Sequence, residues 1–140
     1  MKSKFNILFE QVMNDIEFLD KISEFQATGQ GEMSPEMLEK FAESKNIRVR
    51  YEVAKNHNTP TEVLRKLADD KIWNVKSEVA KNPKTPIDVI RKLANDDSWQ
   101  VRKGVTYNPS TPVEILMKLA EDTEGSVKGE AKRQLRRLKQ

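Results

Sequence analysis

The chain has 140 residues, of which 36% are hydrophobic and 34% charged, with a formal net charge of +3 and no cysteine. The lack of cysteine excludes a disulfide framework, thiolate ligands for zinc or iron–sulfur clusters, and thiol nucleophiles. Ala, Leu, Glu and Lys dominate, and the large charged fraction suits an extended all-α architecture with much surface per residue.

Residues 1–33 predict an amphipathic helical cap followed by a linker over residues 27–33. The apolar positions with helical spacing are Phe5, Leu8, Phe9, Val12, Ile16 and Leu19. We expect this segment to cover the apolar edge of Leu38 and Phe41, and the alternative is a helix that binds a partner. The N-terminal apolar run meets Glu10 too early for a signal peptide, and no stretch approaches the roughly 18 apolar residues of a membrane span. We therefore expect a cytoplasmic, unprocessed protein without membrane contact.

From Ser34 onward the chain repeats with a period of 26 residues. Equivalent positions carry the same residue type in each unit: Thr59, Thr85 and Thr111; Pro60, Pro86 and Pro112; Asn56, Asn82 and Asn108; Leu67, Leu93 and Leu119. About three and a half units fit into residues 34–140, which form the predicted repeat solenoid.

Each unit predicts two helices. Thr59 has the position of an N-cap before Pro60 and Glu62, a capping-box pattern that opens a helix of roughly ten residues. Ser34-Pro35 is a weaker version of that pattern. A second, shorter helix is predicted over 73–81, ended by Asn82 in a left-handed conformation before a proline. Each helix has one apolar stripe, which it can bury only against a neighbouring unit, so the units are expected to stack.

The motif Val-Ala-x-Asn-Pro-x-Thr-Pro-x-x-x-Leu-x-x-Leu-Ala-x-Asp is clearest at 79–96 and 105–122. It resembles the leucine-rich repeat variant family, which is similar to HEAT and armadillo repeats, over residues 34 to about 132. The resemblance implies a right-handed superhelix, and it leaves open whether the second helix of each unit is α or 3₁₀. Family members that hold an iron–sulfur cluster bind it through cysteines, so no cofactor is expected here. His57 departs from the pattern, because the other units have proline at that position.

Similarity to HEAT repeats also implies an inter-repeat ladder, in which an acid of one unit hydrogen-bonds to a cation of another. The residues concerned are Asp70, Asp96 and Asp122, with Arg50, Lys76, Arg102 and Lys128. The ladder is the preferred explanation of this basic column, and phosphate binding is the alternative. By the same resemblance, the second helices line the concave surface.

No convergent set of catalytic or metal-binding residues occurs, because His57 is isolated and adjacent aspartates do not converge. We therefore expect a non-enzymatic binding or scaffold module without a metal. Columns that packing does not dictate are the candidate partner-binding residues on the concave face: Tyr51, Lys55, Trp73, Ser77, Lys81, Trp99, Lys103, Tyr107 and Arg133. Trp73 and Trp99 are interpreted first as wedges between repeats and alternatively as partner anchors.

The expected partner is a protein or peptide bound by a monomer. The alternative is nucleic acid, favoured by the lysine and tyrosine columns and by the basic C-terminal helix. Residues 1–34 are acidic and residues 127–140 are basic. These ends are either solvated caps or docking tails.

Overall fold

The computed structural model describes residues 13–28 and 32–140. All regular secondary structure in these ranges is helical, which confirms the all-α class. The elements are α2 (Asp15–Thr28), α3 (Pro35–Phe41), α4 (Ile47–Lys55), α5 (Thr61–Leu67), α6 (Trp73–Lys81), α7 (Ile87–Leu93), α8 (Trp99–Tyr107), α9 (Val113–Leu119) and α10 (Gly125–Leu138). None of the helices in the described ranges is both long enough and apolar enough to cross a bilayer.

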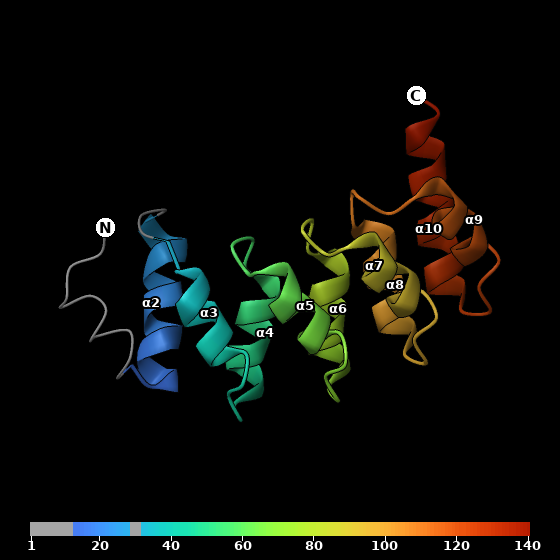
Figure 1. The fold of residues 1–140 in the computed structure, drawn as a ribbon. Coiled ribbons are helices and arrows are strands. Elements are labelled where there is room, and N and C mark those ends of the chain that lie inside the picture. Colours follow the sequence, from blue (N-terminus) through green and yellow to red (C-terminus); the bar gives the residue numbers. More distant parts are fainter. Residues whose placement is uncertain (1–12, 29–31) are drawn as a thin grey trace.

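The helices follow one another in chain order along an elongated body, with α2 at one end and α10 at the other (Figure 1). We call α3, α5, α7 and α9 the A row, and α4, α6, α8 and α10 the B row. Successive B-row helices contact one another directly, and each A-row helix packs against the B-row helices next to it in the chain. The units predicted from the 26-residue period therefore correspond to A–B helix pairs.

A continuous apolar core runs between the two rows, from Met13 to Ala131. Equivalent positions have equivalent burial: Val49, Val75, Val101 and Val127 are all fully buried. Burying one such aliphatic side chain contributes about 1.5–3 kcal/mol. Because each unit contributes the same stripe, the core extends along the body as a strip.

The described part of the N-terminal cap is α2, which packs on the first unit. The ring of Phe18 lies against that of Phe41, with 4.2 Å between their centroids, so the expected covering of Phe41 is confirmed. The assigned stripe was wrong at Ile16, which is 71% exposed, because Phe18 and Ile22 form the buried side instead. The helix also continues through Thr28 into the predicted linker. Phe5, Leu8, Phe9 and Val12 lie outside the described residues.

The predicted threonine N-caps are wrong. The hydroxyl of Thr59 donates to the carbonyl of Val53 at 2.6 Å, and the N-cap position of α5 is occupied by Pro60. Thr85 and Thr111 make the same contact in their units. Ser34 does cap its helix, since its hydroxyl accepts from the N–H of Met37 at 3.1 Å. The threonines are buried and close the end of the preceding B-row helix instead of opening the next A-row helix.

The predicted helix lengths are also reversed. The A-row helices have seven residues and α4, α6 and α8 have nine. All of these B-row helices are α-helical, which settles the choice between α and 3₁₀. Asn82 is extended, with φ −67° and ψ 123°, so the predicted left-handed conformation is wrong.

The helix α10 is longer than the other B-row helices. The asparagine and proline that follow α6 and α8 are replaced at the equivalent positions by Gln134 and Leu135. A proline there lacks an N–H donor and its ring clashes with the preceding turn, so replacing it allows the helix to continue. As a result α10 projects beyond the body at the C-terminal end (Figure 1).

Candidate partner-binding surface

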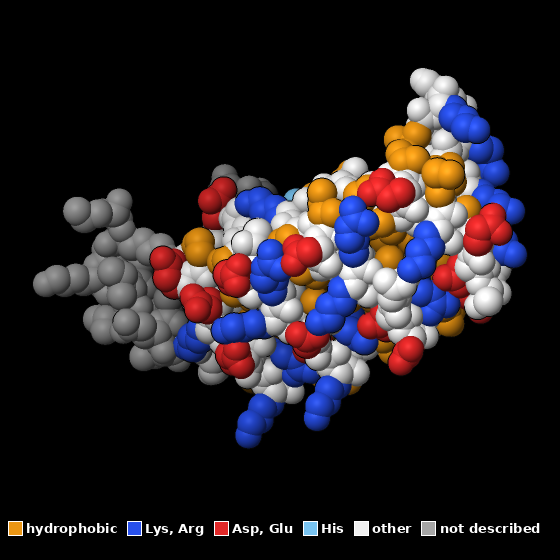
Figure 2. All heavy atoms as spheres, turned by 45° about the vertical axis from the view of Figure 1, so that its right-hand side comes forward, with side chains coloured by type: hydrophobic (Ala, Val, Ile, Leu, Met, Phe, Trp, Pro, Cys, Tyr) orange, Lys and Arg blue, Asp and Glu red, His pale blue; other side chains and the backbone are white. Residues whose placement is uncertain are grey.

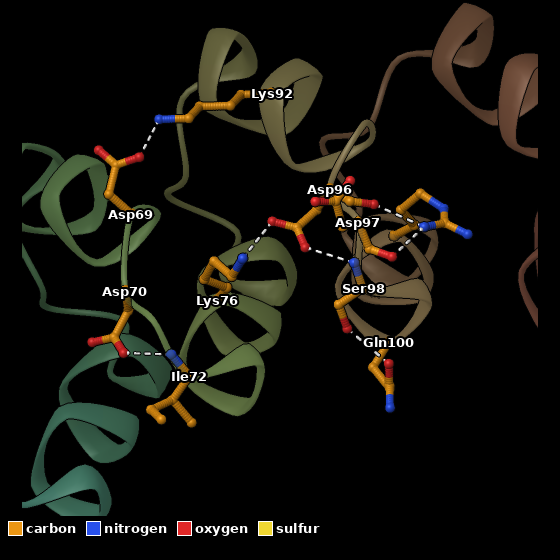
Figure 3. A network of polar contacts seen from close by, with 10 residues as sticks. Asp69, Asp70, Ile72, Lys76, Lys92, Asp96, Asp97, Ser98 and Gln100 are labelled. Atoms are coloured by element: carbon orange, nitrogen blue, oxygen red, sulfur yellow. Dashed lines mark hydrogen bonds and ion pairs between the residues drawn. The ribbon is translucent and has the colours of Figure 1, made fainter.

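The predicted acid–base ladder is present along the B row. Each aspartate before a B-row helix accepts from a cation of the preceding B-row helix. Arg50 Nε donates to Asp70 at 2.7 Å, Lys76 Nζ to Asp96 at 2.6 Å, and Arg102 Nε to Asp122 at 2.8 Å. Figure 3 shows the middle rung, where Lys76 points at Asp96, whose other oxygen accepts from the N–H of Ser98. These cations are therefore engaged within the fold.

The pKa values in the ladder follow from these contacts. The hydrogen bond from Arg102 holds the pKa of Asp122 below its usual range, although burial acts in the opposite direction. Hydrogen bonding to Asp70 and to Asp122 likewise raises the pKa values of Arg50 and Arg102. Arg102 and Asp122 thus hold each other in their charged forms.

A second ladder, of asparagines, was not predicted. The side-chain amide of Asn82 donates to the carbonyls of Ala54 and Asn56, at 2.9 and 3.0 Å. Asn108 donates in the same way to Ala80 and Asn82, at 2.7 and 2.8 Å. The strict recurrence of asparagine was the available signal, because a C-terminal cap alone tolerates glycine as well.

The A row is tied together by exposed ion pairs. The acids lie in neighbouring units, as in the pairs Arg65–Asp88, Arg91–Glu114, Lys92–Asp69 and Lys66–Glu43. Figure 3 shows Lys92 extended toward Asp69 across the gap between two units. Exposed pairs of this kind contribute about 0–1 kcal/mol each, but they neutralise the charge of this face.

The solvent-exposed face of the B row, which we call its outward face, carries most of the predicted site residues. Lys55, Lys81, Tyr107 and Arg133 are exposed at equivalent positions, and Tyr51 and Lys103 are half-buried. Burial and the neighbouring carboxylate of Glu78 raise the pKa of Tyr51. Ser77 is buried, and its hydroxyl lies 3.4 Å from the carbonyl of Gln100, so this residue does not contribute to the outward face.

The tryptophans are not wedged between the repeats. Trp73 and Trp99 are 44% and 39% exposed at the first positions of α6 and α8, and Ile47 is 47% exposed at the equivalent position of α4. The interpretation of both residues as packing wedges is therefore wrong. A row of half-exposed apolar side chains at 26-residue intervals is instead available at one edge of the B row.

Carboxylates recur along the B row and were missed by the sequence reasoning. Glu52 and Glu78 are buried, and Glu130 is half-buried at the equivalent position of α10. Each is paired with a cation of its own helix, Arg48, Lys81 and Arg133 respectively. In α8 the equivalent residue is Gly104. Because a Cβ there would lie 3.0 Å from the carbonyl oxygen of Ser77, this glycine allows α6 and α8 to pack closely.

A cleft lies between α2 and α4 and is lined among others by Phe25, Glu52 and His57. The carboxylate of Glu52 is bound to Arg48, and His57 stands exposed in the turn after α4. Among the residues that the structure describes, no group of three or more His, Cys, Asp or Glu is placed to hold a metal ion.

The helix α10 differs from the rest of the B row in charge. Basic side chains follow one another along the projecting C-terminal end, whereas acidic and basic side chains alternate over the middle of the body (Figure 2). The apolar side of α10, formed by Val127, Ala131 and Leu135, packs against the core. The exposed side therefore consists mainly of lysine and arginine, with Leu138, which is 63% exposed, at its C-terminal end.

Comparison of the chain with protein-family models, with curated proteins and with solved structures finds no match. Any assignment of function consequently depends on the surface of the B row itself.

Proposed function

We propose that the chain is a non-catalytic helical-repeat module that binds a protein partner through the B row. The observation that carries this proposal is the regular exposure of Trp73 and Trp99, at 44% and 39%, at equivalent positions of α6 and α8. Half-exposed tryptophans are costly to leave in water and are enriched among the residues that dominate protein interfaces. Buried polar side chains in the described ranges all have hydrogen-bond partners, so this exposure is not explained by a defect of the core.

The proposal includes a right-handed superhelix of the leucine-rich repeat variant type, with the B row on its concave side. Direct contact between successive B-row helices, through Gly104 in particular, supports an inner position for that row. The A-row helices are joined to each other by ion pairs between extended side chains, as expected of the outer side of an arc. A concave row presents several units to one extended ligand.

Nucleic acid is the second candidate ligand. It is favoured by Tyr107, which is 42% exposed next to the exposed Lys81 and Arg133 at equivalent positions of the flanking helices. An exposed aromatic ring between cations is suited to base stacking.

The test compares affinity capture by the wild-type chain with capture by two double variants, read by quantitative mass spectrometry. The B-row variant is Trp73→Ala with Trp99→Ala. The matched control is Ile87→Ala with Val113→Ala, which removes apolar side chains that are 49% and 50% exposed on the A row. We expect specific partners to be retained by the wild type and the control and lost by the B-row variant.

Thermal melts of all three proteins verify that the variants are folded. Partners that persist in the B-row variant, or that are lost equally in both variants, contradict the assignment of the surface.

A further inference from the structure

Several exposed cations without an ion pair follow one another on α10. Lys132, Arg136 and Arg137 are exposed on α10, and the structure shows no ion pair for them within residues 13–28 and 32–140. The A row differs, because Arg65, Arg91, Lys66 and Lys92 each meet an acid of a neighbouring unit. The charge of α10 is therefore available to a ligand, while that of the A row is already neutralised.

The basic side chains of α10 form one continuous surface. Residues three and four apart lie next to each other on a helix, so Lys132 and Arg136 form one ridge and Arg133 and Arg137 form an adjoining ridge. Arg133 connects this surface to the B row, because it occupies the position equivalent to Tyr107 in the preceding unit. The guanidinium of Arg133 is hydrogen-bonded to Glu130 at 2.8 Å, and this contact fixes its place beside the tyrosine.

The other side of α10 is not free for a membrane. Val127 and Ala131 are fully buried and Leu135 is partly buried, so the exposed apolar surface of α10 is limited to Leu138, which is 63% exposed, and one side chain is a small face for entering a bilayer. An anionic macromolecule in solution is the ligand that this charge distribution fits.

The charge of the molecule changes sign along its length. The N-terminal helix α2 carries four acids and one lysine, whereas α10 carries five cations and one acid. Glu52 and Glu78 of the B row are each paired with a cation of their own helix, so the acidic end of the molecule is α2. A uniformly charged phosphate backbone that extended from α10 to α2 would be attracted at one end and repelled at the other. A peptide differs from a nucleic acid in this respect, because its acidic residues can be confined to the segment that contacts α10.

We propose that the surface formed by Lys132, Arg133, Arg136 and Arg137, together with Tyr107, binds an acidic peptide segment that carries an apolar side chain. The inference depends on the proposed function and names the class of partner. Carboxylates of the peptide pair with the arginines, which are suited to bidentate contacts, and its apolar side chain covers the exposed ring of Tyr107.

The experiment is a fluorescence-anisotropy titration of the full chain against three short fluorescein-labelled probes. The first is a peptide of glutamates with a central pair of leucines, the second has glutamines in place of the glutamates, and the third is an oligothymidylate of similar length. We expect micromolar binding of the glutamate peptide, weaker binding of the oligothymidylate and no binding of the glutamine peptide. The affinity should fall when the salt concentration rises from about 50 to about 200 mM.

The decisive variant is Arg136→Glu with Arg137→Glu. It should lower the affinity for the glutamate peptide about tenfold or more, since it replaces two attractions by repulsions. The matched control is Lys71→Glu with Lys84→Glu, which changes the net charge equally at exposed turn lysines away from α10. Tyr107→Ala should lower the affinity for the glutamate peptide severalfold. Circular dichroism verifies the folding of each variant.

Tighter binding of oligothymidylate than of the glutamate peptide, lost in the same variant, would assign the surface to nucleic acid and overturn the proposal. Absence of binding by all three probes, or equal weakening in the α10 variant and its control, also overturns it. If partner capture still depends on Trp73 and Trp99 in that case, the proposed function stands and only the acidic class of partner is wrong.

Discussion

Replacing Asn108 by alanine removes three hydrogen bonds from the asparagine ladder. The side-chain amide donates to the carbonyls of Ala80 and Asn82 at 2.7 and 2.8 Å, and its oxygen accepts from the N–H of Ser110 at 2.8 Å. The side chain is 4% exposed, so water does not replace these partners without rearrangement. The two carbonyls belong to the C-terminal end of α6, and the substitution therefore weakens the joint between two units.

The size of the effect follows from the number of bonds. A hydrogen bond between neutral groups contributes about 0.5–1.5 kcal/mol net, so three bonds give about 3 kcal/mol. Asn108→Asp should cost more than Asn108→Ala, because it keeps the shape but turns a carboxylate toward two carbonyl oxygens. Asn56→Ala is the matched control. The described residues give the side chain of Asn56 one hydrogen bond, from the N–H of Asn58 at 2.8 Å, and we expect a loss of about 1 kcal/mol.

Urea denaturation followed by far-UV circular dichroism measures the three free energies of unfolding. The order expected is Asn56→Ala as the mildest change, then Asn108→Ala, then Asn108→Asp. If Asn108→Ala costs no more than Asn56→Ala, the inter-repeat bonds do not contribute as the geometry requires. A slope of the denaturation curve that differs between variants would indicate that the units no longer unfold together, and the midpoint of each transition would then be compared separately.

Three further changes test other parts of the fold. The pKa of Asp122 is lowered in the folded state by Arg102, so the unfolded chain binds the proton more strongly; the contribution of this pair is present above about pH 4 and is lost as the pH falls through the folded pKa. In urea titrations from neutral to acidic pH, the wild type should therefore lose more stability than Asp122→Asn, and parallel losses would contradict the role of the ion pair. Gly104→Ala should destabilise the chain by about 1–3 kcal/mol through contact with α6, whereas Gly129→Ala, which meets nothing within 4 Å, should stabilise it by up to about 1 kcal/mol; calorimetric melts showing equal effects would disprove the close packing. Thr85→Asp, a favourable N-cap residue, should lower the melting temperature because the carboxylate cannot donate to the carbonyl of the preceding helix, and an unchanged or higher value would restore the capping interpretation.

The repeat register was predictable because helical repeats make mostly local contacts. A residue and its equivalent 26 positions later meet the same neighbours, so Val75 and Val101 are buried alike without any knowledge of the rest of the chain. The acid–base ladder was also predicted correctly, since Asp70 and Arg50 recur with the same spacing in each unit. The buried valines and the acid–base pairs that recur every 26 residues in the sequence therefore occupy equivalent places in successive units.

Roles that depend on direction were predicted less well. Thr59 and its equivalents were assigned to the helix that follows them, but their hydroxyls donate to the helix that precedes them. A hydroxyl before a proline fits both assignments in sequence terms, and the choice depends on which carbonyl lies within reach after the units stack. Trp73 was interpreted as a wedge between repeats for a similar reason, because its recurrence indicates a constrained position but not the side toward which it faces.

The sequence alone determined the helical class, the period and which residues form the apolar strip, because hydrophobic spacing and proline positions act within a few residues of the chain. Only the tertiary structure decided which recurrent polar residues join neighbouring units and which remain on the surface. Asn82 reaches across to α4, while Arg136 reaches no acid within the described ranges. Asn82 lies where adjacent units pack closely, as they also do at Gly104, whereas Arg136 lies on the part of α10 that projects beyond the body (Figure 1), and neither arrangement is encoded in any single unit.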